Sequence, residues 1–97
     1  MRLFRLSDAS GTLQFDLIKN GENVSLADFQ SNDVFIYDTG FSLFVWVGKG
    51  ASAGEQRSWL KVAQAYLRTV EDPAIPLAKC VEGHESLGFR NSLSGVA

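Results

Sequence analysis

The stretch that decides the fold is residues 31–70, which read SNDVFIYDTGFSLFVWVGKGASAGEQRSWLKVAQAYLRTV. It contains two nearly continuous runs of β-prone residues, at 34–37 and at 43–47. Such runs are typical of central strands that are covered on both faces. Because the residues between them, 39–42, include Gly and Ser and favour a turn, the two runs predict a buried β-hairpin.

A long helix is predicted after the hairpin. Ser52 is a favourable N-cap residue, and Glu55, three residues later, completes the pattern of a capping box. Pro73 cannot continue a helix, so we expect the helical region to end before it. Apolar residues recur at three- and four-residue spacing, which predicts one side packed against the sheet. These residues are Trp59, Val62, Ala63, Tyr66 and Val70, with Leu60 and Leu67 widening the stripe.

The rest of the chain completes one domain. Two strands that are buried on both faces need a covering layer on each side. The predicted fold is therefore α+β: a mixed sheet of about five strands between one long and one short helix, over residues 1–97. The other predicted elements are an edge strand at 3–6, a half-buried strand at 12–18, a helical turn at 25–29, a fifth strand at 77–81 and a short helix at 87–93 that includes Phe89 and Leu93.

Composition restricts the classes of function. The chain has 97 residues, 9 basic and 11 acidic, and a net charge of −2, which gives no case for nucleic acid binding. Cys80 is the only cysteine and cannot form an internal disulfide, so we expect a reducing compartment. No apolar run approaches the roughly 20 residues of a membrane span. Whether Met1 begins a whole protein or a repeat cut from a longer one stays open.

A loop acid and a helix-start acid suggest a metal site. Calcium requires carboxylate and carbonyl oxygens that converge from several directions. The Asn32 carbonyl, one oxygen of Asp33 and a bidentate Glu55 would supply part of such a set. The local alternative is that Asp33 caps a turn and that Glu55 only bonds back to the Ser52 amide.

Three segments resemble a gelsolin-family repeat, and the likeness extends from Leu3 to about Leu93. They are LFRLSDASG at 3–11, SNDVFIYD at 31–38 and FVWVGKGAS at 44–52. The resemblance implies an actin-regulatory module of the kind found in gelsolin, villin, severin and fragmin, which contain three or six repeats. These proteins sever, cap or nucleate actin filaments under calcium control, and many are inhibited by phosphoinositides. It also implies a cytoplasmic, cytoskeletal location.

The resemblance further implies one calcium ion within the repeat. The matching positions are Asn32 through its carbonyl, Asp33 through its side chain and Glu55 on the long helix. The last ligand of the family site is a backbone carbonyl near the end of the repeat, for which Val96 is the counterpart. The ion would lock the long helix to the sheet.

One side of the predicted helix is polar and basic, with Arg57, Lys61, Gln64 and Arg68 opposite the apolar stripe. These residues would contact actin or a phosphoinositide headgroup, and the alternative is an ordinary solvated helix face. Some actin-binding repeats of the family carry an acid further along this helix that shares a second calcium with actin. No Asp or Glu occurs here between Glu55 and Glu71, which weakens the case for that shared site.

Other functions are less well supported by the sequence. Cys80 and His84 lack a third group that would orient them for catalysis, so no enzyme is predicted. Two thiol or imidazole side chains are too few for structural zinc, and the glycines at 48, 50 and 54 do not form a phosphate-binding loop. A gelsolin-like interaction module with a silent ion site stays open as an alternative. A domain like actin-depolymerising factor is disfavoured by the VWVGKG segment at 45–50.

Overall fold

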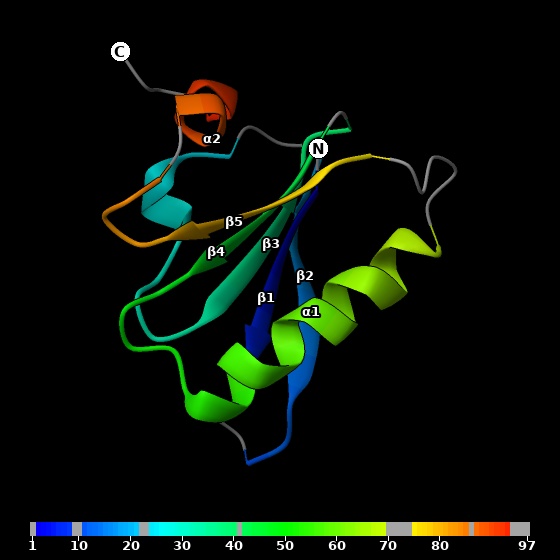
Figure 1. Ribbon diagram of the computed structural model, residues 1–97, viewed down its shortest axis with the longest axis vertical. Coiled ribbons are helices and arrows are strands. Elements are labelled where there is room, and N and C mark those ends of the chain that lie inside the picture. The colour runs from blue at the N-terminus through cyan, green and yellow to red at the C-terminus, as the bar shows by residue number, and fades with distance from the viewer. Residues whose placement is uncertain are drawn as a thin grey trace.

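The chain folds into one mixed five-stranded sheet with the strand order β2-β1-β3-β4-β5 (Figure 1). A computed structural model describes residues 2–8, 11–21, 24–40, 42–69, 75–85 and 87–93. All pairings are antiparallel except that of β4 with β5, which is parallel. The strands are β1 (Arg2–Ser7), β2 (Gln14–Asn20), β3 (Val34–Asp38), β4 (Leu43–Val47) and β5 (Leu77–Val81), and the helices are η1 (Leu26–Asp28), α1 (Ala53–Leu67) and α2 (Leu87–Ser92).

The predicted hairpin is confirmed, but the predicted place of the first strand is wrong. β3 and β4 pair antiparallel, and all residues of both strands are buried. Residues 3–6 were expected at an edge, whereas β1 lies between β2 and β3. The side chains of Leu3 and Leu6 are both 0% exposed because they point to opposite faces of the sheet and each enters a core. The edge positions belong to β2 and β5.

Helices cover both faces of the sheet, as Figure 1 shows, and this confirms the predicted α+β sandwich. Successive residues of a strand point to opposite faces. Phe35 therefore enters an aromatic core with Phe29, Trp46 and Phe89 on the α2 side. Ile36 instead enters a mainly aliphatic core on the α1 side. None of the helices that the structure describes is both long enough and apolar enough to cross a membrane.

Helix α1 begins as the sequence predicts. The Glu55 amide donates to Ser52 Oγ at 3.0 Å, and the Ser52 amide donates to Glu55 Oε1 at 2.9 Å, which is a complete capping box. The helix ends at Leu67, six residues before Pro73. Leu60 was expected in the buried stripe, but its side chain is 44% exposed because the packed side of α1 is narrower than the apolar pattern.

A polar contact fastens the far end of α1 to the sheet. The Tyr66 hydroxyl donates to Asp38 Oδ2 at 2.6 Å, and Arg2 Nη1 donates to the same hydroxyl at 3.3 Å. Burial raises the pKa of Tyr66, and the bond to Asp38 adds to this. The Tyr66 ring also packs edge-on against Phe4 of β1. Both ends of α1 are thus fixed, one by the capping box and one by Tyr66.

Candidate metal site and its surroundings

The loop that carries Asn32 and Asp33 is held by the loop that follows β4. The Gly50 amide donates to the Ser31 carbonyl at 2.7 Å, and the Gly48 amide donates to the Asp33 carbonyl at 3.1 Å. Asn32 is exposed in this turn, whereas Asp33 is only 6% exposed. These backbone bonds fix Asp33, which directly precedes β3, against the loop that leads from β4 to α1.

Glu55 is the most deeply buried acid among the described residues, at 1% exposure. Its Oε1 accepts from the Ser52 amide and its Oε2 accepts from the Asp8 amide, both at 2.9 Å. Burial raises the pKa of Glu55, the two amides work against this rise, and the negative charge of Asp33 increases it. Asp33, which comes from a distant part of the chain, therefore lies close enough to disfavour the ionised form of Glu55.

The donor set of these residues fits a hard cation. Asp33 and Glu55 have carboxylate oxygens and Asn32 has a backbone carbonyl, which are ligand types that calcium prefers. A carboxylate oxygen that accepts one hydrogen bond keeps a second lone pair, so the amides do not exhaust Glu55. Among the described residues, no cluster of three or more Asp, Glu, His or Cys side chains is placed to hold a metal. Such a site would need backbone oxygens or water, and Val96 lies outside the described residues.

Asp8 belongs to this site although sequence reasoning missed it. Its amide donates to Glu55, and its Oδ2 accepts from Ser52 Oγ at 2.6 Å. Both partners lie more than 40 residues away in the sequence. Residues 7–11 look like an ordinary polar turn, and no local signal marks Asp8 as a partner of the helix start.

Comparison with known proteins establishes the family. The model of the gelsolin repeat matches residues 21–90. The chain belongs to the gelsolin family. This repeat is 40% identical over 92 residues to gelsolin-like protein 2 of Lumbricus terrestris, covering 95% of this chain and 25% of the relative. It is 42% identical over 89 residues to gelsolin of Drosophila melanogaster, covering 91% of this chain and 11% of the relative.

Solved structures show the same fold. One is a Thorarchaeota protein, 2DGel3, in complex with rabbit actin; it has a TM-score of 0.80 and 24% identity, over 95% of this repeat and 44% of that chain. A second, Thorarchaeota ProGel with rabbit actin, has a TM-score of 0.77 and 16% identity, over 96% and 98% of the two chains. The repeat spans a quarter or less of the length of the relatives named above. Family membership groups the chain with binding modules and not with enzymes.

The polar side of α1 is open to solvent in this repeat. The side chains of Arg57, Lys61, Gln64 and Arg68 are all exposed. Leu60, 44% exposed, is next to them on the helix surface. Residues three and four positions apart on a helix are neighbours, so Leu60 adjoins Arg57 and Gln64. The four polar residues form a basic ridge along α1, and Leu60 gives this ridge an apolar margin that the sequence pattern did not predict.

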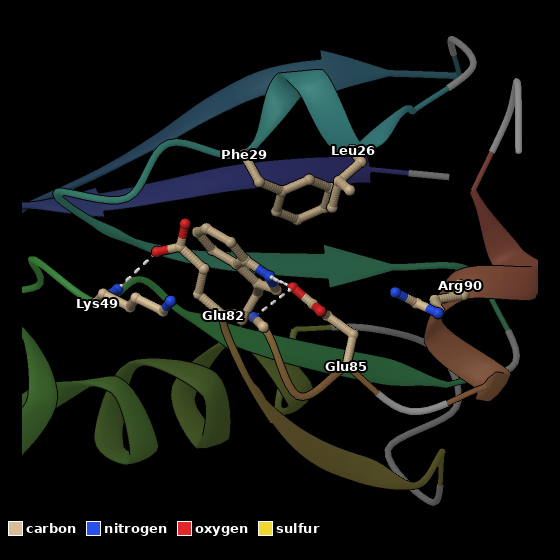
Figure 2. A pocket seen from close by; sticks show the side chains of 8 residues that line it. Leu26, Phe29, Lys49, Glu82, Glu85 and Arg90 are labelled. Atoms are coloured by element: carbon tan, nitrogen blue, oxygen red, sulfur yellow. Dashed lines mark hydrogen bonds between the residues drawn. The ribbon is translucent and has the colours of Figure 1, made fainter.

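The opposite side of the repeat has an open pocket of about 340 Å³, shown in Figure 2. Phe29 and Trp46 form part of its wall. Its acids are engaged within the protein: the Trp46 indole donates to Glu85 Oε2 at 2.9 Å, and the Lys49 amide donates to Glu82 Oε1 at 2.8 Å. Glu82 Oε2 also accepts from Ser31 Oγ at 2.6 Å, so this wall helps to hold the loop that carries Asp33.

The Cys80 and His84 side chains have different surroundings. Cys80 is 3% exposed and lies in the aromatic core. His84 is exposed in the turn after β5, where its amide donates to the Val81 carbonyl. The buried thiol therefore has the surroundings of a core side chain.

Proposed function

We propose that this gelsolin repeat is a calcium-binding, actin-regulatory module in which calcium joins the loop before β3 to the start of α1. The observation that carries the proposal is the Glu55 carboxylate, 1% exposed and close enough to Asp33 for that charge to raise its pKa. Keeping two buried acids ionised together is costly unless a cation neutralises them.

Asp33 and Glu55 would be the side-chain ligands of the ion. The Asn32 carbonyl and a carbonyl near Val96 would add backbone oxygens, and water would complete the six to eight ligands that calcium takes. Asp8 and Ser52 would hold Glu55 in position through their amides. When bound, calcium supplies positive charge that offsets both acids and fixes α1 against the sheet.

Actin is the proposed partner. The two structural neighbours named above were solved with rabbit actin, and severin of Echinococcus granulosus is a further relative, 37% identical over 75 residues. The exposed ridge of Arg57, Lys61, Gln64 and Arg68 would contact actin, with a phosphoinositide headgroup as the alternative ligand. Severing, capping or nucleation would belong to a longer protein in which this repeat packs with others. A relative from Halocynthia roretzi is named as cytoplasmic gelsolin, which supports a location in the cytoplasm with the cytoskeleton.

Thermal unfolding with and without calcium tests the ion site. A ligand that binds only the folded state at about 100 times its Kd stabilises it by about 2.7 kcal/mol. For a domain of this size, that is a rise in Tm of roughly 10–20 °C. We expect Glu55→Gln to remove most of the rise. The matched control is Glu85→Gln, which makes the same change in the pocket wall beside Trp46 and should keep the full rise. An unchanged Tm of the wild type at millimolar calcium would refute the ion site.

A second candidate is a gelsolin-fold interaction module that uses no calcium. The observation that favours it is the pair of backbone amides, from Ser52 and Asp8, that already bond to Glu55. In this case Glu55 is a structural acid that closes the capping box and ties it to the segment after β1. Calorimetric titration separates the candidates, because only the first predicts saturable heat of calcium binding.

A further inference from the structure

Arg5 of β1 occupies an unusual position beside the proposed ion site. Its Nε lies 3.9 Å from Asp33 Oδ2, which is an ion pair but too long for a hydrogen bond. That nitrogen is buried and has no hydrogen-bond partner within the described part of the chain. β1 holds Arg5 there, because Arg5 pairs in register with Phe35, two residues after Asp33.

This contact is electrostatic in origin. A buried N–H without a partner is costly, so the position of the guanidinium is not explained by hydrogen bonding. The side chain of Asp33 is only 9% exposed, and water therefore screens its charge poorly. The guanidinium stays charged at any ordinary pH, so its positive charge beside Asp33 is permanent.

We propose that Arg5 is the built-in counter-cation of Asp33 and that it competes with calcium for this carboxylate. The inference rests on the proposed calcium site and adds a regulator to it. With Arg5 in place, Asp33, Glu55 and Arg5 together carry one negative charge, whereas without it Asp33 and Glu55 carry two. A divalent ion is attracted less strongly to the first arrangement than to the second.

Two consequences follow. Without calcium, Arg5 offsets part of the repulsion between Asp33 and Glu55, so it stabilises the ion-free fold. With calcium, the guanidinium must remain next to a divalent cation or turn away from Asp33. The Arg5 side chain is 37% exposed, which gives its charged end a route to water. Arg5 therefore raises the calcium concentration at which the site fills.

The test is a calorimetric titration with calcium chloride, at fixed ionic strength, of the wild type and of Arg5 variants. Arg5→Gln removes the charge and keeps a polar side chain, and we expect its Kd for calcium to be about tenfold lower. Arg5→Lys keeps the charge, so its Kd should stay within about twofold of the wild type. The control Arg90→Gln makes the same charge change in α2, which carries none of the proposed ligands, and should leave the Kd unchanged.

Thermal unfolding in a chelator provides a second readout. Arg5→Gln should lower the Tm of the ion-free protein, so that calcium raises its Tm by more than it raises that of the wild type. Arg5→Met, which keeps much of the apolar stem, replaces Arg5→Gln if the latter does not fold.

The outcomes separate this inference from the proposed function. If the wild type binds calcium and the neutral variants bind it equally or more weakly, the role of Arg5 is refuted and the calcium site stands. If neither the wild type nor the neutral variants bind, both are refuted. If only the neutral variants bind, the proposed calcium site of the wild type is refuted and Arg5 is confirmed as the group that keeps calcium out.

Discussion

Gly48 shows how a single residue positions the candidate site. A Cβ atom at this position would collide with the Ser31 carbonyl oxygen and would lie 2.8 Å from the carbonyl oxygen of Asp33. Gly48→Ala should therefore push the loop at 31–33 away from α1. We expect a loss of about 1–3 kcal/mol in the free energy of unfolding, typical of overpacking, together with weaker calcium binding. Denaturant unfolding and calorimetry measure the two effects.

The control for this change is Gly88→Ala. Gly88 lies in α2, and a Cβ atom there would meet nothing within 4 Å. Alanine is about 1 kcal/mol better than glycine inside a helix, so this variant should be neutral or slightly more stable. Equal losses in the two variants would mean that close approach at Gly48 does not position the loop.

The role of a residue could be predicted where its partner is close in the sequence, and could not where the partner is distant. Ser52 and Glu55 are three residues apart, and their capping box was visible as a pattern and is present in the structure. Asp33 as a calcium ligand was inferred from the residues, was supported by the resemblance, and stays a prediction. Asp8 and Arg5 could not be predicted, because their partners Glu55 and Asp33 are brought to them only by the sheet and by the packing of α1.

At the level of elements, helix α1 carries the prediction about actin. Leu60 and the basic ridge beside it are exposed, so changes there should leave the fold intact. We expect Leu60→Ser and Lys61→Glu to weaken binding to monomeric actin in calcium by about fivefold or more, with unchanged Tm. Sedimentation velocity measures the binding, and Arg90→Glu in α2 is the matched charge reversal. Binding that every variant retains would assign actin to another surface, and loss of binding to phosphoinositide vesicles alone would assign the ridge to lipid.

Sequence patterns predicted where the helices and strands lie along the chain better than which elements lie beside them in the fold. The capping box marked the start of α1 because capping is local. The predicted position of β1 was wrong because a short apolar run looks like an edge strand, whereas pairing on both sides depends on distant strands. Leu60 was misassigned for a related reason: the sequence shows apolar spacing but not how wide a strip of the helix the sheet can cover.

At the scale of the molecule, the described acids whose pKa values are shifted fall into two groups with opposite effects on stability. The pKa values of Asp28, Glu82 and Glu85 are lowered; burial opposes this in Asp28 and Glu85 but is outweighed by hydrogen bonds and nearby cations. Their stabilisation is present above the ordinary pKa and is lost as the pH falls through the folded pKa. The raised pKa of Glu55 has the reverse effect: its stabilisation is present at low pH and is lost as the pH rises through its folded pKa. Glu55 therefore makes the ion-free fold less stable at neutral pH than an ordinary glutamate would.

Calcium should offset the destabilising effect of the ionised Glu55 at neutral pH. This gives a prediction for the pH dependence of the whole domain. A ligand carboxylate must be deprotonated, so protons compete with calcium at Glu55. Because the folded pKa of Glu55 is above its ordinary value of 4.5, this competition begins at a higher pH than for an exposed glutamate. We expect the calcium-induced rise in Tm to shrink as the pH is lowered from 7, and to be smaller at pH 4.5 than at neutral pH. The small rise that remains in Glu55→Gln should lack the contribution of Glu55 and depend less on pH. Differential scanning calorimetry at matched ionic strength measures both curves, and a wild-type rise that stays constant down to pH 4.5 would exclude Glu55 as a ligand.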